Sequence, residues 1–235
     1  MKKQVWIKMM LLLAVLTQLP SCSVSKSAIG QKLRNGFTVL GYGDSITEGS
    51  AEFSSYLFPL DSMLKAAGFK PTFIGPRRSQ RGGIAIDHFG YGGRNAEYLA
   101  ARVDSVYGLY PADLVLLHAG HNHFVEEAPV KGIVNAQRNI IQTIRKKNPA
   151  SVIIVAAVIT SGKLPKYEYI PDLNIAIKAM VDSLNDNHVV FVDQSANWDW
   201  MQYTISDKVH PNRAGANRIA ANWFDAIVKI SREKL

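Results

Sequence analysis

The chain has 235 residues, of which 47% are hydrophobic and 20% charged, and its formal net charge is +8. This composition provides enough apolar material for a folded core, excludes an intrinsically disordered chain, and fits one domain. No dense run of Lys and Arg interleaved with aromatic residues occurs, so we expect no nucleic-acid partner.

The chain begins with a basic and then apolar segment that is typical of an export signal. Three lysines precede the apolar run 9–16, and the tetrad Leu-Pro-Ser-Cys follows at 19–22. The apolar run is too short to be a stable transmembrane anchor, so we expect residues 1–21 to be a signal peptide. The tetrad resembles the lipobox of bacterial lipoproteins, in which the cysteine is acylated and becomes the new N-terminus.

Cys22 is the only cysteine of the chain, and lipidation would explain its position. We therefore expect an exported bacterial protein, anchored to a membrane and periplasmic or on the cell surface. Ordinary signal-peptidase cleavage near Ser21 is the alternative. The polar residues 22–36 are interpreted as a tether, and residues 37–235 as the folded domain.

Apolar, β-branched runs alternate with segments of helical spacing through this domain. The runs suit strands buried on both faces and cover residues 37–42, 72–74, 114–117, 152–159 and 189–192. The helical segments cover residues 54–67, 132–147, 173–184 and 214–230. The alternation predicts an α/β fold, a three-layer α/β/α sandwich with a central, mostly parallel five-stranded sheet. In such a sheet, catalytic residues lie at the carboxyl ends of the strands.

The first candidate motif follows the first predicted strand directly. Residues 41–49 read Gly-Tyr-Gly-Asp-Ser-Ile-Thr-Glu-Gly, which places Ser45 in a turn at the carboxyl edge of the sheet. A nucleophile is possible there, although a serine after a strand is more often a turn or N-cap residue. The Gly-x-Ser-x-Gly elbow of the α/β-hydrolases is not present in this stretch.

The second candidate motif immediately precedes the last predicted helix. Asp207 and His210 are separated by two residues, so the carboxylate can accept a hydrogen bond from one imidazole nitrogen. The other nitrogen is then available to take a proton from a serine. The alternative is an aspartate that caps a turn beside a surface histidine.

Four short blocks together resemble the SGNH, or GDSL, hydrolases in order and spacing. They are Gly-Asp-Ser-Ile-Thr at 43–47, Gly-Tyr-Gly-Gly at 90–93, Gly-His-Asn at 120–122 and Asp-Lys-Val-His-Pro-Asn at 207–212. The resemblance covers residues 38–224. It implies the flavodoxin-like fold of that superfamily and ester hydrolysis without a cofactor.

The resemblance also implies a role for individual residues. Ser45 corresponds to the nucleophile, and Asp207 with His210 completes the triad. The backbone N–H groups of Ser45 and Gly93 and the side-chain amide of Asn122 correspond to an oxyanion hole, which stabilises the negative charge of the tetrahedral intermediate.

One block departs from the family pattern and gathers histidines. The third block commonly reads Gly-x-Asn-Asp, whereas this chain has His123 in place of the aspartate. His118 and His121 lie nearby and His88 elsewhere, but their spacing matches no recognised zinc pattern, so we expect no metal. We expect Asp44, His121 and His123 to contact substrate.

Residues 43–93 most resemble the acetyl xylan esterase-like carbohydrate esterases. We therefore predict deacetylation of a polysaccharide or other glycan, with Trp198 and Trp200 as candidates for stacking on sugar rings. Packing within a loop is the alternative for these rings. Two other functions remain open: a lysophospholipase or acyl thioesterase of the same superfamily, and a non-catalytic surface glycan-binding protein.

Overall fold

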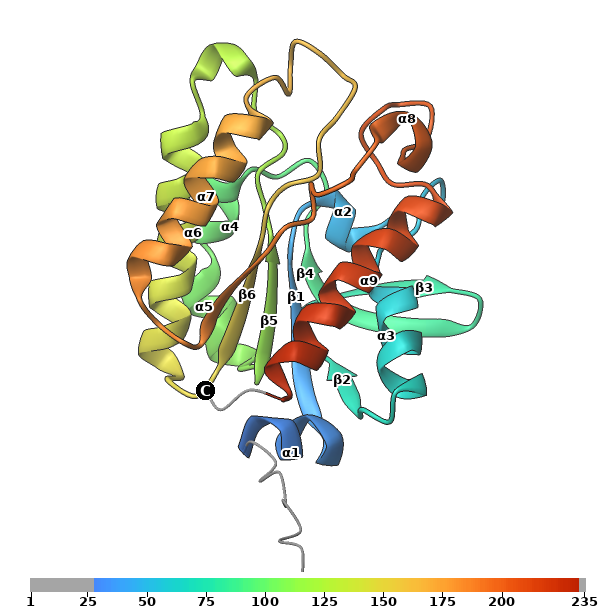
Figure 1. Ribbon diagram of the computed structural model, residues 1–235, viewed down its shortest axis with the longest axis vertical. Coiled ribbons are helices and arrows are strands. Elements are labelled where there is room, and N and C mark those ends of the chain that lie inside the picture. Colours follow the sequence, from blue (N-terminus) through green and yellow to red (C-terminus); the bar gives the residue numbers. More distant parts are fainter. Residues whose placement is uncertain (1–27, 233–235) are drawn as a thin grey trace, which may run out of the picture.

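The computed structural model describes residues 28–232, so the predicted signal peptide and Cys22 lie outside the described residues. A twisted sheet forms the centre, with the strand order β3-β4-β1-β5-β6-β7 and with β2 paired to β1 (Figure 1). The strands are β1 (Phe37–Gly43), β2 (Pro71–Phe73), β3 (Arg77–Arg81), β4 (Ile84–Gly90), β5 (Leu114–His118), β6 (Val152–Ala156) and β7 (Val189–Val192).

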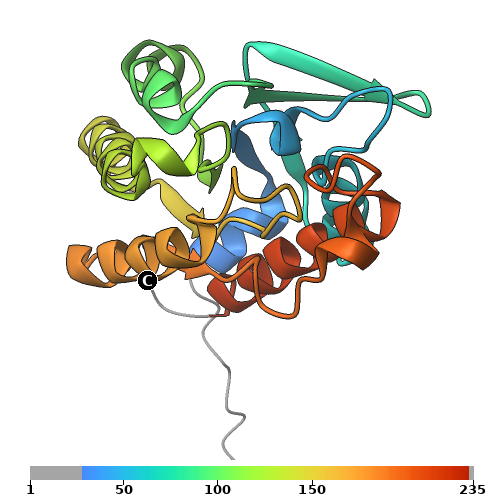
Figure 2. The same ribbon diagram turned by 90° about the horizontal axis from the view of Figure 1, so that it is seen from above.

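Helices cover both faces of the sheet, as Figure 2 shows from above. They are α1 (Ala28–Asn35), α2 (Ser45–Glu48), α3 (Leu57–Ala66), α4 (Ala96–Ala100), α5 (Val103–Leu109), α6 (Val130–Lys147), α7 (Ile170–Leu184), α8 (Trp200–Tyr203) and α9 (Arg213–Ile230), with a 3-10 turn at Val125–Glu127. Among these described helices, none combines the length and the apolar character needed to cross a bilayer.

Two hydrophobic cores result, one on each face of the sheet. In β5, Val115 and Leu117 pack against the core that contains α4–α7, whereas Leu114 and Leu116 pack against the core that contains α3 and α9. Side chains alternate between the faces of a strand, so a strand buried on both faces is apolar throughout. The three-layer α/β/α sandwich predicted from the sequence is confirmed.

The mostly parallel sheet is confirmed, but it has seven strands in place of the predicted five. Six strands run parallel, namely β2, β4, β1, β5, β6 and β7, and β3 is antiparallel to β4. The predicted strand at 72–74 is the short β2, and β3 and β4 are the two strands that were not predicted. Asp87 and His88 interrupt the apolar pattern of β4, which explains why the sequence did not indicate it. Gly82 and Gly83, both with positive φ, form the turn of the β3–β4 hairpin.

The segment predicted as a tether is helical where it is described. Leu33 of α1 is buried in the core beside α3, and Lys32 forms a salt bridge of 2.5 Å with Asp113, which precedes β5. An apolar residue and an ion pair therefore attach α1 to the domain. The ordered part begins before residue 37, earlier than the sequence predicted.

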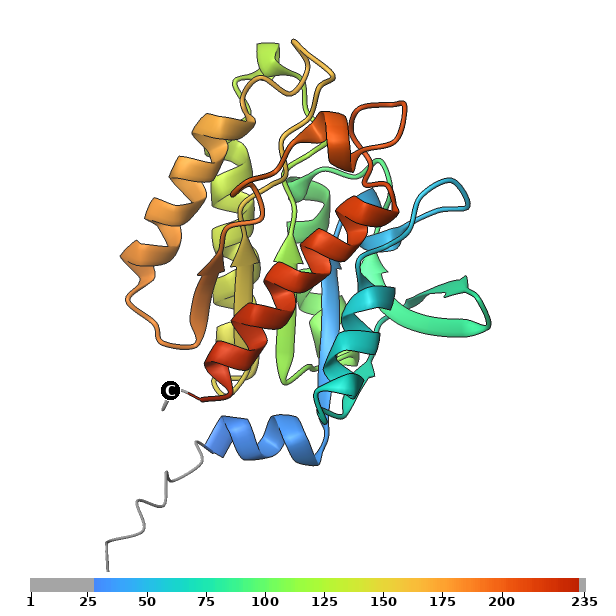
Figure 3. The same cartoon turned by 45° about the vertical axis from the view of Figure 1, so that its right-hand side comes forward.

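The carboxyl ends of the parallel strands meet at one edge of the sheet. Gly43 of β1 pairs with Gly90 of β4 on one side and with His118 of β5 on the other. The loops after these strands therefore emerge together. Figure 3 shows α2, α8 and the long loop after β6 at this end of the sheet.

Candidate active site

Ser45 is the first residue of α2 and follows β1 after a single residue. That residue, Asp44, caps the helix, because its Oδ1 accepts a hydrogen bond of 3.0 Å from the Ile46 N–H. The preceding Gly43 allows the sharp turn: a Cβ there would lie 2.3 Å from the His118 carbonyl oxygen. The local sequence thus brings the Ser45 hydroxyl to the carboxyl edge with little freedom.

A continuous hydrogen-bond chain connects the three residues proposed as a triad. Ser45 Oγ lies 2.8 Å from His210 Nε2, and His210 Nδ1 lies 2.5 Å from Asp207 Oδ2. The other oxygen, Asp207 Oδ1, accepts hydrogen bonds from the N–H groups of Val209 (2.9 Å) and His210 (3.0 Å). A carboxylate at Nδ1 favours the tautomer with its proton on Nδ1, which leaves Nε2 to accept the serine proton.

The environment of Asp207 keeps this carboxyl ionised. Burial raises its pKa, but the hydrogen bonds from the His210 ring and from the N–H groups of His210 and Val209 outweigh that effect. The pKa of Asp207 consequently lies below its usual value. A negative charge stands beside Nδ1 at neutral and mildly acidic pH.

Two further contacts hold the His210 loop in place. The Phe53 ring stacks on the His210 ring, with centroids 4.1 Å apart and planes 17° from parallel. In addition, the Lys208 carbonyl accepts hydrogen bonds from Ser161 Oγ (2.7 Å) and the Gly162 N–H (3.0 Å). The sequence did not indicate Phe53, because it lies in an irregular loop without a motif.

The glycine turn of the second block lies beside the nucleophile. A Cβ on Gly92 would be 3.7 Å from Ser45 Cβ, and the Gly92 N–H donates to the Glu48 carboxylate at 2.6 Å. Gly93 has a φ of 72°, and a Cβ there would meet nothing within 4 Å. Within the described chain, the Gly93 N–H has no hydrogen-bond acceptor.

Glu48 is a residue that sequence reasoning missed. Besides the Gly92 N–H, its carboxylate pairs with Arg77 of β3, whose guanidinium lies over the Tyr91 ring. Glu48 therefore fixes the glycine turn relative to α2. Its position at the end of the Gly-Asp-Ser-Ile-Thr-Glu run was the available signal.

Asn122 is tied to the same turn. Its Nδ2 donates a hydrogen bond of 3.0 Å to the Arg94 carbonyl, and its φ is 69°, in the left-handed region that Asn tolerates better than most residues. An amide nitrogen carries two hydrogens, so one remains for a ligand. The structure therefore brings the second and third blocks together near Ser45.

The two histidines proposed as substrate contacts have different surroundings. His123 lies between Glu97 (2.9 Å from Nε2) and Glu127 (2.7 Å from Nδ1), so both ring nitrogens are paired. His121 is 2% exposed and lies 3.6 Å from the fully buried Asp44. Substrate contact remains a prediction for these residues, and the burial of Asp44 and His121 does not favour it.

The two tryptophans pack within the loops. Trp198 is 8% exposed and donates from Nε1 to the Thr160 carbonyl at 3.0 Å. Trp200 covers Gly162, where a Cβ would come within 2.4 Å of the indole. Packing therefore accounts for Trp198, whereas Trp200 is only partly buried.

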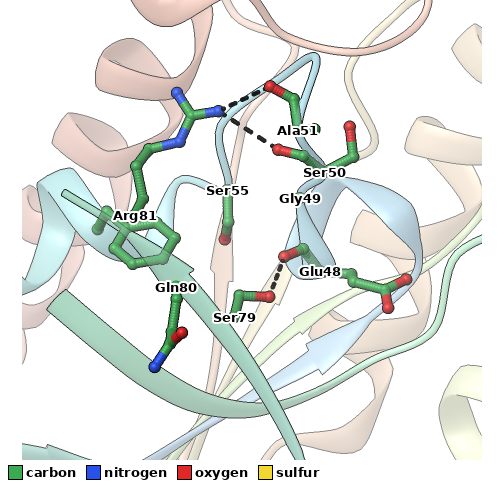
Figure 4. Close-up of a pocket in the computed structure, with 9 residues that line it drawn as sticks. Glu48, Gly49, Ser50, Ala51, Ser55, Ser79, Gln80 and Arg81 are labelled. Carbon is green, nitrogen blue, oxygen red and sulfur yellow. Dashed lines mark hydrogen bonds between the residues drawn. The ribbon is translucent and has the colours of Figure 1, made fainter. Parts of the chain in front are cut away.

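A polar pocket of about 420 Å³ opens at the other end of α2 (Figure 4). Ser79 donates to the Glu48 carbonyl at 2.7 Å, and Arg81 donates to the carbonyls of Ser50 and Ala51. These bonds join the β3–β4 hairpin to the loop after α2. The pocket is lined by Glu48, Gly49, Ser50, Ala51, Ser55, Phe58, Ser79, Gln80 and Arg81.

A parallel α/β sheet with a Ser-His-Asp hydrogen-bond chain at its carboxyl edge is the arrangement of a serine hydrolase. The GDSL-like lipase/acylhydrolase family model matches residues 42–218, more than half of the chain. The chain therefore belongs to this family and is a carboxylic ester hydrolase. Among curated proteins, no match is found.

Solved structures show the same fold. A family 3 carbohydrate esterase from Clostridium thermocellum is 25% identical, with a TM-score of 0.73, and the match covers 84% of this chain and 98% of that one. An acetyl esterase mutant with an acetate ion is 23% identical (TM-score 0.71; 83% and 98% covered). A GDSL-like lipase from Bacteroides thetaiotaomicron is 21% identical (TM-score 0.59; 82% and 88% covered).

Proposed function

We propose that the chain is a serine esterase that removes acetyl or other short acyl groups from a glycan. The 2.8 Å contact between Ser45 Oγ and His210 Nε2 is the observation that carries the proposal. It allows the imidazole to take the hydroxyl proton as Ser45 attacks the ester carbonyl. The alkoxide of the glycan leaves with that proton, and an acyl-enzyme remains on Ser45.

Water completes the reaction by the same residues. His210 takes a proton from the attacking water and returns it to Ser45 Oγ when the acyl-enzyme breaks down. Asp207 stays ionised throughout and stabilises the imidazolium that forms in each step. The products are the free carboxylic acid and the deacylated glycan, and the enzyme is regenerated without a cofactor.

The oxyanion of both tetrahedral intermediates would lie among three donors. They are the N–H groups of Ser45 and Gly93 and the amide of Asn122. The N–H of Ser45 is at the N-terminus of a helix, where the first N–H groups have no acceptor within the helix. The charge of the oxyanion is thus offset without reorganisation of the protein.

Two observations support a glycan over a long-chain lipid. The pocket beside α2 presents hydroxyl, amide and guanidinium groups from Ser50, Ser79, Gln80 and Arg81, which suit sugar hydroxyls. In addition, the similar structures include a carbohydrate esterase and an acetyl esterase with an acetate ion. The lipase-type alternative is supported by a weaker likeness, to a GDSL-like lipase with a TM-score of 0.59.

The substrate is tested by incubating the full chain with acetylated xylan and with p-nitrophenyl acetate, butyrate and palmitate. Release of acetate from xylan that disappears in Ser45→Ala, with rates that fall as the acyl chain lengthens, is the expected result. Palmitate as the best model ester, with no acetate released from xylan, would refute the glycan substrate and favour a lipase or thioesterase.

We also propose that Cys22 carries a lipid that anchors the enzyme to a bacterial membrane, periplasmic or on the cell surface. The basic and apolar start of the chain and the Leu-Pro-Ser-Cys tetrad support this proposal. Mass spectrometry of the N-terminal peptide should find an acylated cysteine. An unmodified N-terminus from cleavage near Ser21, or membrane association that persists in Cys22→Ser, would refute it.

A further inference from the structure

Three buried side chains lie close together next to the turn that carries the nucleophile. No motif in the sequence links the three. Asp44 follows β1, His118 ends β5, and His121 lies in the loop after β5. One donor atom from each of the three lies within 4.8 Å of the other two. All three side chains are buried, with exposed fractions of 0%, 0% and 2%.

Five of their six polar side-chain atoms have no hydrogen-bond partner in the described part of the chain. Asp44 Oδ1 is bonded to the Ile46 N–H, but Oδ2 is not bonded, and neither are the two nitrogens of His118 or of His121. The 3.6 Å between Asp44 Oδ2 and His121 Nδ1 is longer than a hydrogen bond. Each buried polar atom left without a partner destabilises a protein by about 1–3 kcal/mol, so five in one cluster indicate a missing ligand.

The other buried histidines in this region contrast with the cluster. His88 has both nitrogens in hydrogen bonds, to Ser79 and Gly90, and His123 has both nitrogens paired with glutamates. Burial of histidine in this protein is therefore normally accompanied by satisfied nitrogens. His118 and His121 are exceptions that face one carboxylate.

We propose that Asp44, His118 and His121 bind a divalent transition-metal ion, with Zn²⁺ as the best match. Two imidazole nitrogens and one carboxylate oxygen form a donor set that suits Zn²⁺, whereas Mg²⁺ and Ca²⁺ prefer oxygen ligands. Bonds of about 2.0–2.2 Å hold tetrahedral ligands roughly 3.4 Å apart, so the rings would move inward by about an ångström on binding.

The metal would support the nucleophile turn and take no part in the reaction. Asp44 would use Oδ2 for the metal while Oδ1 keeps the N-cap hydrogen bond to α2, the helix that begins with Ser45. The ion would thereby connect the end of β5 to the start of α2. Since the cluster is buried, the ion is expected to enter during folding and to exchange slowly.

The test is zinc content in the full chain, purified from cells grown with added zinc and freed of loose metal by gel filtration. Elemental analysis should find about one zinc per chain. Replacement with Co²⁺ during refolding should give the visible d–d absorption of a four-coordinate ion. Zinc far below one per chain and no visible absorption with Co²⁺ would overturn the proposal and leave a buried water as the occupant.

Variants identify the ligands. His121→Gln keeps a polar side chain beside Asp44 and should lose the zinc, whereas His188→Gln should keep it. His188 is the matched control because it lies in the loop before β7, at the opposite end of the sheet. Circular dichroism shows whether each variant is folded. Equal zinc in a folded His121→Gln and in the wild type would contradict the assignment, even if the wild type contains metal.

Discussion

His88 should make the stability of this fold depend on pH. Its Nδ1 accepts a hydrogen bond of 2.9 Å from the Gly90 N–H, and its Nε2 lies 2.8 Å from Ser79 Oγ. Ser79 donates its own hydrogen to the Glu48 carbonyl, so Nε2 must be the donor to Ser79. The buried ring is therefore neutral. A second proton, on Nδ1, would remove the acceptor of the Gly90 N–H and place two hydrogens against each other.

The size of this pH-dependent change in the free energy of unfolding follows from the shift in the pKa of His88. Burial lowers the pKa of His88 from 6.5 to about 4; Arg77 also lowers it, whereas Glu48 and Asp87 raise it by less than burial lowers it. Since the unfolded chain binds the proton first, this stability is complete above pH 6.5 and is lost as the pH falls to about 4. The full shift corresponds to about 3 kcal/mol, of which about 2 kcal/mol is lost between pH 7 and pH 4.5.

The assay is urea unfolding followed by tryptophan fluorescence at pH 7 and pH 4.5, on the wild type and on His88→Gln. All other titrating groups are common to the two chains, so the difference in their pH dependence isolates His88. The wild type should lose about 2 kcal/mol more than the variant between the two pH values. An identical loss in both chains would refute the neutral, buried state of His88.

Substitutions at three further positions test the site and its geometry. Asp207→Asn should lower kcat by roughly a thousandfold or more with little change in KM, because the amide cannot stabilise the imidazolium; steady-state kinetics that show a small loss would contradict this role. Asn122→Ala and Asn122→Gly should each reduce kcat by about a hundredfold or more. Alanine removes the amide and also strains the positive φ, whereas glycine removes the amide without strain. Recovery of activity in Asn122→Gly would therefore argue against an oxyanion role. Gly43→Ala should reduce the free energy of unfolding by at least about 2 kcal/mol, because the new Cβ meets the backbone of His118; an unchanged urea midpoint would contradict the packing.

The parts of the fold that the sequence predicted are those with uninterrupted patterns. β1, β5, β6 and β7 are apolar runs, and the helices α6 and α9 show clear helical spacing. The sequence missed β4 and the exposed β3, because their polar residues do not follow the pattern of a buried parallel strand. It also missed α1, because the contacts that attach this helix to the domain, a salt bridge and one buried leucine, leave no pattern in the local sequence.

Within the site, the sequence predicted contacts between residues that are close in the chain and missed contacts between residues that are distant in it. The two-residue gap between Asp207 and His210 predicted the pairing that the structure shows at 2.5 Å. Phe53 contacts the His210 ring from a distant part of the chain, and no spacing rule indicates such a contact. Likewise, the histidine spacing did not indicate the cluster of His118 and His121 with Asp44, because Asp44 comes from a different strand end.

The central claim is that Ser45 is an activated nucleophile, and covalent labelling tests it most directly. A serine-reactive fluorophosphonate should modify the full chain once, on the peptide that contains Ser45, and mass spectrometry should find no label in Ser45→Ala. His210→Ala should be labelled far more slowly, because the base is removed. Labelling that persists in Ser45→Ala, or a wild type that stays unlabelled, would contradict the account.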